Sequence, residues 1–364
     1  MYTNDSEAFD PSIIRAVQRH KEFYEGKRNY LVKIEVPLVC DELKSEIQFD
    51  DVDWDRDFDE YVESRVENGK IKSRKRIKMK LEDDYIPYYH PYFGISIHHS
   101  FFGGKVQFGG GTSYAEHVIS SACEWKKLKY DRNGKWVQKL AKGLAFCRDH
   151  GEGVLVASLR GGNGPLDMAN GVMGNELFTE LYDDPDNIHK VMEICHESIL
   201  AMFQLQKQNC SKIEGGHIAP MGNFWIPESC IGHISLDAAC LVGPGLFEEF
   251  EKPYLNRLAE ETNGYVVHSH MLGRRMFKEM CGIKRMLVFV PVDDPGQPTL
   301  LDELSSVLEA VGDTPLLVNI PENRLKETLP KLAGRRAVIN LTATDSDHAR
   351  RQMEIVDKIC PLLR

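Results

Sequence analysis

The chain has 364 residues, a formal net charge of −10 and 42% apolar residues. This size and apolar content suit one large domain with a substantial core, and the acidic balance argues against nucleic acid as a partner. Nine cysteines without C-x-x-C spacing and a polar, acidic amino terminus predict a cytoplasmic protein without disulfides or a signal peptide. The apolar runs are too short to suggest a membrane span.

The amino-terminal part of the chain is predicted to contain a helix, a strand and a long polar insertion. A loose apolar stripe predicts a helix over residues 11–26, and a β-prone run predicts a strand over residues 30–36. Residues 40–92 carry an acidic tract and then a basic tract, which predicts solvated surface; docking of a charged partner protein is the alternative. The glycine-rich stretch 103–111 lacks the spacing of a nucleotide-binding loop, and residues 135–150 are predicted to be helical.

Predicted strands and helices alternate through the rest of the chain. With residues 30–36, the predicted strands are 153–159, 213–218, 234–238, 265–268, 285–290, 315–320 and 337–341. The predicted helices are 174–210, 244–263, 273–282, 299–312 and 322–333. Most of these strands are unbroken apolar runs, which is typical of strands buried on both faces of a parallel sheet. Eight such units predict an α/β fold, a (β/α)8 TIM barrel that forms a single domain over residues 1–364; a doubly wound open sheet is the alternative.

Polar or ionisable residues stand where each predicted strand ends. They are Glu35, Arg160, His217, Asp237, His268, His270, Asp293, Asp294, Asn319 and Asn340. Single residues of these types are common turn formers. In a closed barrel, however, the carboxyl ends of the strands surround the active site, so together these side chains predict a ring of converging polar groups.

Two histidines at the end of one predicted strand indicate a metal site or an acid–base pair. His268 and His270 are two residues apart, and side chains two apart on a strand point to the same side. Zinc takes four ligands, and the candidates for the third ligand from the protein stay open at this point: Asp237, His217, His233, Cys240 and Asp293. An open position at such a site would allow a thiol or water to bind and become nucleophilic.

Several ordered stretches resemble the uroporphyrinogen decarboxylase superfamily. They are Ile234-Ser-Leu-Asp237 with the following Gly243-Pro244 helix start, Gly264-Tyr-Val-Val-His268-Ser-His270, Gly161-Gly-Asn-Gly-Pro165 with Leu181-Tyr-Asp-Asp-Pro185-Asp, and Phe108-Gly-Gly-Gly111 with Trp125. The likeness extends from about residue 93 to residue 345 and implies a barrel with an insertion after its first strand and a helical extension before it. The resemblance implies a small-molecule substrate bound at the strand ends and a possible homodimer.

The departures from the family pattern favour its methyltransferase branch over true decarboxylases. The arginine-rich segment that grips tetrapyrrole carboxylates is missing from residues 15–37, and bidentate arginines are how such carboxylates are held. The methyltransferase branch typically shows His-x-Cys where this chain has His268-Ser-His270, so that His270 replaces the cysteine as a competent zinc ligand. The later cysteine and histidine of the two branches are both absent from residues 340–347.

The resemblance therefore implies a zinc-dependent methyltransferase that moves a methyl group to or from a thiol or a corrinoid carried by a partner protein. In this interpretation His268 and His270 hold zinc, and Asp237, His268 and Arg160 are catalytic. Four other strand-end residues are expected to contact the cofactor: Glu35, His217, Asn319 and Asn340. The alternative is a decarboxylase of a tetrapyrrole or a smaller acid, in which Asp237 stabilises a protonated ring and Arg160 holds a carboxylate; a non-catalytic binding protein is a third hypothesis.

Overall fold

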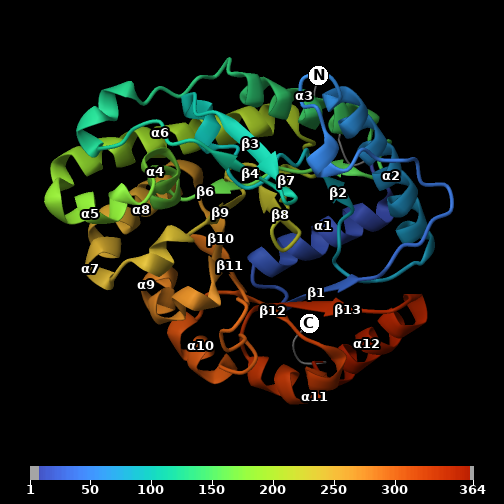
Figure 1. Cartoon of the computed structure of the whole chain (residues 1–364). Helices are drawn as coiled ribbons and strands as arrows, with labels where there is room; N and C mark the ends of the chain where they lie inside the picture. Colours follow the sequence, from blue (N-terminus) through green and yellow to red (C-terminus); the bar gives the residue numbers. More distant parts are fainter. Residues whose placement is uncertain (1–7, 361–364) are drawn as a thin grey trace.

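A central parallel sheet organises the fold in the computed structural model, which describes residues 8–360. Its seven strands are all paired in parallel. Their spatial order is β1 (Tyr30–Glu35), β13 (Ala337–Thr342), β12 (Leu316–Asn319), β11 (Met286–Val292), β10 (Tyr265–His270), β9 (His233–Ser235) and β6 (Gly162–Asn163). Figure 1 shows these strands at the centre, surrounded by the helices.

A short parallel pair stands between the two ends of this sheet. It consists of β2 (Tyr88–Tyr89) and β5 (Val156–Ala157), and the chain runs from β5 directly into β6. On the other side, the amide of Asp84, just before β2, donates to the carbonyl of Val32 in β1. The ladders of hydrogen bonds do not join these strands into one closed ring. The prediction of a TIM barrel is thus confirmed as a TIM-barrel-like α/β arrangement, without a demonstrated closure.

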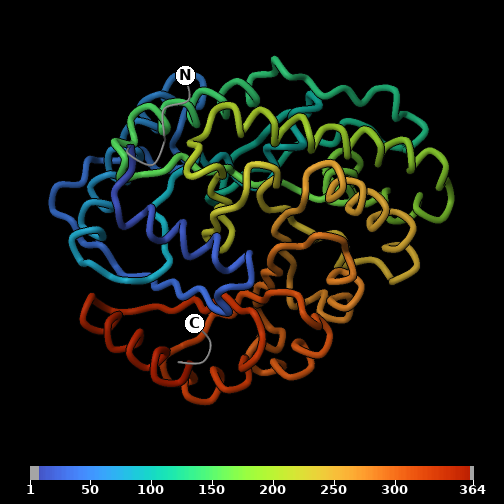
Figure 2. The backbone as a smooth tube through the Cα atoms, turned by 180° about the vertical axis from the view of Figure 1, so that it is seen from behind, coloured from blue at the N-terminus to red at the C-terminus, as the bar shows by residue number. Residues whose placement is uncertain are grey.

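Helices follow most of the strands and lie on the outside of the sheet (Figure 1). They are α1 (Pro11–Tyr24), α2 (Phe58–Lys78), α3 (Lys135–His150), α4 (Pro165–Met173), α5 (Glu176–Asp183), α6 (Pro185–Asn209), α7 (Pro244–Leu246), α8 (Lys252–Thr262), α9 (Phe277–Cys281), α10 (Leu304–Val311), α11 (Leu325–Thr328) and α12 (Ser346–Ile359). Seen from behind in Figure 2, α10 to α12 form one side of the molecule and α3 and α6 the opposite side. Within residues 8–360, no helix combines the length and the apolar character that crossing a membrane requires.

The predicted strand 213–218 has a different role from the one expected. The observed strand β7 (Gly216–Ala219) pairs antiparallel with β8 (Phe224–Pro227) and lies outside the parallel sheet. The chain reverses between them through Gly222 and Asn223, whose φ angles of 75° and 56° are left-handed. Consecutive left-handed residues favour a tight reversal over a crossover, so β7 pairs with the strand that follows it and forms a hairpin.

The insertion 40–92 is more structured than the predicted solvated surface. It contains the 21-residue helix α2, whose Phe58, Tyr61 and Val62 are buried. In the last turn of this helix, Arg76 forms a buried ion pair of 2.5 Å with Asp83. Charged residues are so frequent in this segment that the apolar face of α2 is not evident from the sequence. The same segment also contains β2. The predicted helix 174–210 is two helices in the structure, α5 and α6, and Pro185 is the first residue of α6.

Strands β10 and β11 bring the predicted histidines to one end of the sheet. Tyr265, Val266 and Val267 are fully buried, and Val267 pairs with Phe289. Apolar residues are required there because helices cover the outer face while side chains fill the interior. Polar residues appear only at the carboxyl end, from His268 onwards.

Candidate functional site

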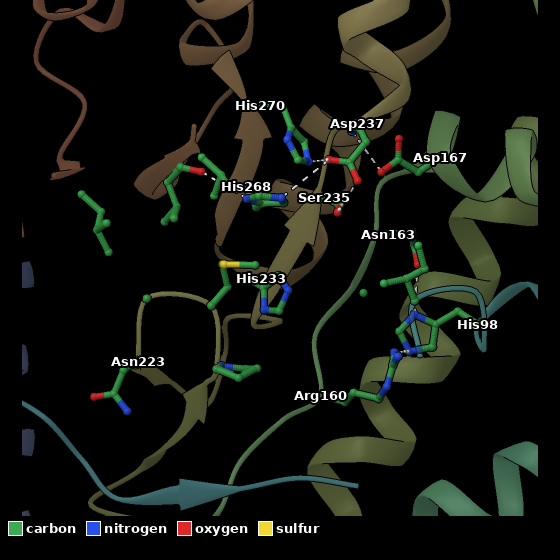
Figure 3. A pocket seen from close by; sticks show the side chains of 18 of the residues that line it. His98, Arg160, Asn163, Asp167, Asn223, His233, Ser235, Asp237, His268 and His270 are labelled. Atoms are coloured by element: carbon green, nitrogen blue, oxygen red, sulfur yellow. Dashed lines mark hydrogen bonds and ion pairs between the residues drawn. The ribbon is translucent and has the colours of Figure 1, made fainter. Parts of the chain in front are cut away.

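A cavity of about 1200 Å³ opens at the carboxyl ends of the strands. Most of the side chains predicted at the strand ends line it: Glu35, Arg160, Asp237, His268, His270, Asp294, Asn319 and Asn340. Figure 3 shows that the labelled residues come from several strands and face a shared space. The structure thus brings together eight of the ten strand-end residues on the wall of one cavity.

Asp237, His268 and His270 form the tightest group of possible ligands in this cavity. The Nε2 atoms of His268 and His270 lie 3.7 and 3.5 Å from Oδ1 of Asp237. The donor atoms of all three side chains lie within 4.8 Å of one another. The two rings are steeply inclined, with centroids 5.0 Å apart. These separations exceed a hydrogen bond and leave room for an ion between the three atoms.

The contacts on the far side of each ring fix which nitrogen faces Asp237. Nδ1 of His270 lies 2.7 Å from Oδ1 of Asp294, and Nδ1 of His268 lies 3.3 Å from the carbonyl oxygen of Val290. Both partners only accept, so each Nδ1 carries the proton and donates it. In the neutral form of each ring, the lone pair of Nε2 therefore points toward the Asp237 carboxylate. Three electron-pair donors that converge without a proton between them fit a divalent cation, and imidazoles oriented by a carboxylate or a carbonyl are typical of metal ligands.

Asp237 is held in place by a buried carboxylate at the start of α4. Asp167 accepts hydrogen bonds from the backbone amides of Asp237, at 3.2 Å, and of Ala238, at 2.6 Å. Burial, and then the charge of Asp237, raise the pKa of Asp167 well above its usual value. The contacts fix the backbone of Asp237, while Ser235 donates to its side chain at 3.3 Å. The carboxylate thus has one exposed side toward the cavity and a defined position.

A buried glutamate lies behind Asp167. Glu251, from the π-helical turn Phe247–Glu251, is fully buried and accepts from the amide of Leu166 through Oε2 at 2.7 Å. Its Oε1 has no hydrogen-bond partner among the described residues. Burial, and then the nearby Asp167, raise the pKa of Glu251 well above its usual value. The protonated form is therefore favoured, which avoids placing a second unpaired charge behind Asp237.

Arg160 lies on another part of the cavity wall. One of its terminal nitrogens, Nη1, lies 2.8 Å from Nε2 of His98, and the other donates to the carbonyl of Gly94. Figure 3 places Arg160, His98 and Asn163 together, apart from the group around Asp237. The cavity therefore has two polar parts of different character, one acidic and one cationic.

The other predicted residues are distributed unevenly. Asn340 donates to Asn319 at 2.8 Å across two neighbouring strands, and Glu35 is exposed at the end of β1. His217 does not line the cavity: its Nδ1 lies 2.9 Å from the carbonyl of Ser211, and burial lowers its pKa to about 4. His217 belongs to the hairpin strand β7 rather than to the parallel sheet, which takes it away from the strand ends.

Three further candidates for the third ligand do not join the group. Asp293 does not line the cavity and accepts from the amide of Leu300 at 2.7 Å. Cys240 lines the cavity, but its thiol contacts Ser269 at 3.4 Å, and burial raises its pKa. His233 also lines the cavity but lies outside the cluster formed with Asp237.

Sequence reasoning missed His98, Asn163 and Asp167. The available signals were weak: His98 follows no predicted strand, and Asp167 stands in the first turn of a helix that begins with Pro165. An acidic residue there is commonly read as complementing the helix dipole. Here it supports a residue 70 positions further along the chain.

No model of a known family matches the chain, and neither does any curated protein sequence. Among solved structures, the fold is similar to a methyltransferase from Methanosarcina mazei, with a TM-score of 0.56 and 12% sequence identity. The similarity covers 94% of this chain and 98% of that one. At this identity the comparison establishes a shared fold along nearly the whole chain, and the superfamily expected from the sequence motifs stays a prediction.

Proposed function

We propose that this chain is a zinc-dependent methyltransferase in which Asp237, His268 and His270 hold the metal and a thiol of the substrate takes part in methyl transfer. The observation that carries the proposal is the convergence of two imidazole lone pairs and one carboxylate at the wall of the cavity. Asp237, His268 and His270 would hold the metal and would leave a coordination position open to a substrate atom. The likeness in fold to a methyltransferase from Methanosarcina mazei supports the same class of reaction.

The protein residues supply ligands and fix their orientation. Asp294 and the carbonyl of Val290 hold the two rings in the tautomer that presents Nε2. Asp167 fixes the backbone of Asp237 before any ligand binds, so little rearrangement is needed to complete the site. Zinc, when bound, would lower the pKa of a coordinated thiol, which supplies a nucleophilic thiolate at neutral pH.

The methyl group must come from, or go to, a second reactant that reaches the same cavity. The proposal assigns this role to a corrinoid carried by a partner protein, as the sequence motifs imply. The open end of the cavity at the strand ends is compatible with a partner that approaches from that side. Association of the chain into a homodimer also stays a prediction.

Metal analysis of the purified protein tests the proposal directly. We expect about one equivalent of zinc per chain, lost in a His268→Ala/His270→Ala double variant. His150→Ala is the matched control, because His150 is exposed at the end of α3 and contacts only that helix through Phe146. Wild-type protein that binds no zinc after reconstitution, or a double variant that binds it equally well, would contradict the proposal.

Decarboxylation of a carboxylic acid is a second candidate, which the guanidinium of Arg160 in the same cavity favours. In that function Arg160 holds the carboxylate and Asp237 stabilises the positive charge that develops on the substrate. Release of carbon dioxide from porphyrinogens or smaller acids by the metal-free protein would support this function over methyl transfer. Zinc-dependent transfer of a methyl group to a thiol would exclude it as the main activity.

A further inference from the structure

Arg160 is a half-buried cation for which residues 8–360 supply no anion. Its guanidinium contacts an imidazole and a backbone carbonyl, both neutral, and none of the residues 8–360 forms an ion pair with it. Its Nε is buried without a hydrogen-bond partner among the same residues. Burial lowers its pKa only to about 10, so the side chain stays charged at neutral pH. An uncompensated cation in a cavity wall is costly unless a ligand completes it.

The contacts of Arg160 leave a defined set of donors. A guanidinium carries five N–H groups, and the structure uses one toward His98 and one toward Gly94. The Nε proton and one proton on each terminal nitrogen remain free to donate. Donors arranged in a planar fork match the two oxygens of a carboxylate.

A chain of hydrogen bonds extends this set of donors to Asn163. Arginine can only donate, so Nε2 of His98 accepts, and its Nδ1 proton is donated to Oδ1 of Asn163 at 3.1 Å. The orientation of the Asn163 amide follows, and its NH2 group is left without a partner among the described residues. Both Arg160 and Asn163 line the cavity, so their unused N–H groups are available to one ligand.

The neighbouring imidazoles contribute no negative charge and little positive charge. Burial, and then the charge of Arg160, lower the pKa of His90 to about 3 and that of His98 well below its usual value. Burial likewise lowers the pKa of His99 to about 4. These rings are therefore neutral near pH 7, and the positive charge on this wall is concentrated on Arg160.

We propose that Arg160 and Asn163, joined through His98, form a subsite for a carboxylate group of the small-molecule substrate. The inference rests on the proposed function in placing the reacting sulfur at Asp237, His268 and His270, and it adds that the same molecule carries a carboxylate held at Arg160. The substrate class is thus a carboxylic acid that also bears a thiol or a methyl thioether. The carboxylate is assigned to the part of the cavity at Arg160, and the sulfur to the part at Asp237; Figure 3 shows both parts.

Binding of a carboxylate and of its neutral amide to the same protein tests the subsite. The probes are 3-(methylthio)propionate and 3-(methylthio)propanamide, titrated by ligand-observed NMR into protein stripped of metal with a chelator. For the wild type we expect the carboxylate to bind at least about tenfold more tightly than the amide, which corresponds to about 1.4 kcal/mol. Arg160→Gln is expected to abolish this preference.

Two further variants keep the test independent of folding. Asn163→Asp keeps the shape and the acceptor for His98 but places a carboxylate beside Arg160, so it too should abolish the preference. Arg351→Gln, on the exposed face of α12, makes the same change of charge away from the cavity and should leave the preference intact. Thermal unfolding of each variant shows whether it has folded.

The outcomes separate the subsite from the metal. Equal binding of the two probes to the wild type would overturn the subsite, as would a preference that survives in both cavity variants. Metal content and methyl transfer decide the proposed function separately. A carboxylate preference that persists in the His268→Ala/His270→Ala variant would support the subsite even if no zinc were found.

Discussion

Replacing Asp294 by asparagine tests whether the outer contacts of the histidines tune a metal site. Both oxygens of Asp294 are in use: Oδ1 accepts from Nδ1 of His270 and Oδ2 from the amide of Leu272, each at 2.7 Å. Asparagine has the same shape but offers one oxygen and one NH2 group. Whichever way the amide turns, one N–H group of the protein then faces another donor.

The size of the effect follows from these contacts. Losing one hydrogen bond to a charged acceptor costs about 1.5–3 kcal/mol, and removing the partner of a ligating histidine commonly weakens metal binding about 10–100-fold. The two figures agree, because a tenfold change in affinity equals about 1.4 kcal/mol. We therefore expect Asp294→Asn to bind zinc about 10–100-fold more weakly than the wild type, as measured by competition with a chromogenic chelator at pH 7.

The neighbouring carboxylate provides a matched control. Asp293 does not line the cavity, and the one hydrogen bond it is seen to accept, from Leu300, can be kept by the oxygen of an amide. Asp293→Asn removes the same charge one residue away and should change zinc affinity by much less than tenfold. Equal zinc affinity of Asp294→Asn and Asp293→Asn would refute the assignment of Asp294 as the group that orients His270.

Three further predictions concern stability, each measured by urea unfolding. The unfolded chain protonates His90 near pH 6.5, but the folded chain does so only at about pH 3. Below pH 6.5 the unfolded state therefore binds more protons, and this group lowers the free energy of unfolding by about 1.4 kcal/mol for each pH unit of acidification. His90→Gln should reduce the pH dependence of the free energy of unfolding by that amount. Arg76→Gln leaves Asp83 buried without its cation and should cost about 3 kcal/mol, whereas Arg74→Gln, in a half-exposed pair, should cost less than about 1 kcal/mol; equal losses would contradict the burial of the first pair. The pKa of Glu251 is raised, so its contribution to stability is present at low pH and is lost as pH rises toward that pKa. Glu251→Gln should therefore gain stability relative to the wild type between pH 5 and pH 8, and a constant difference would show that this carboxyl does not titrate there.

The carboxy-terminal half of the sheet could be predicted from sequence because its strands are buried on both faces. The predicted strands 265–268, 285–290, 315–320 and 337–341 correspond to β10, β11, β12 and β13, with ends shifted by at most two residues. In an α/β fold, apolar runs that alternate with helical segments form the buried strands of the parallel sheet. The boundaries shifted because polar residues such as His270 still belong to the ladder.

The amino-terminal half was predicted less well because pairing there depends on short or irregular segments. Strand β2 has two residues and lies inside a segment whose average composition is polar. The predicted strand 213–218 overlaps β7 only in part, and β7 pairs with β8 rather than with the parallel sheet, since a local reversal of the chain decides between a hairpin and a crossover. Helix α2 was missed because charged residues surround its apolar face.

In the site, local spacing could be predicted from the sequence, but the alignment of neighbouring strands could not. The i, i+2 spacing of His268 and His270 predicted one shared direction, but composition left five candidates for their partner. Parallel pairing sets His268 level with Ser235, the last residue of β9. Asp237 follows two residues later, beyond the strand, and its Oδ1 lies 3.5 Å from Nε2 of His270. On the other side His270 is level with Val292, the last residue of β11. Asp294 follows two residues later and accepts from Nδ1 of His270, whereas Asp293 accepts from the amide of Leu300. The strand register therefore selects the carboxylates on both sides of the histidines, and a sequence can identify them only when it also fixes how the strands are aligned.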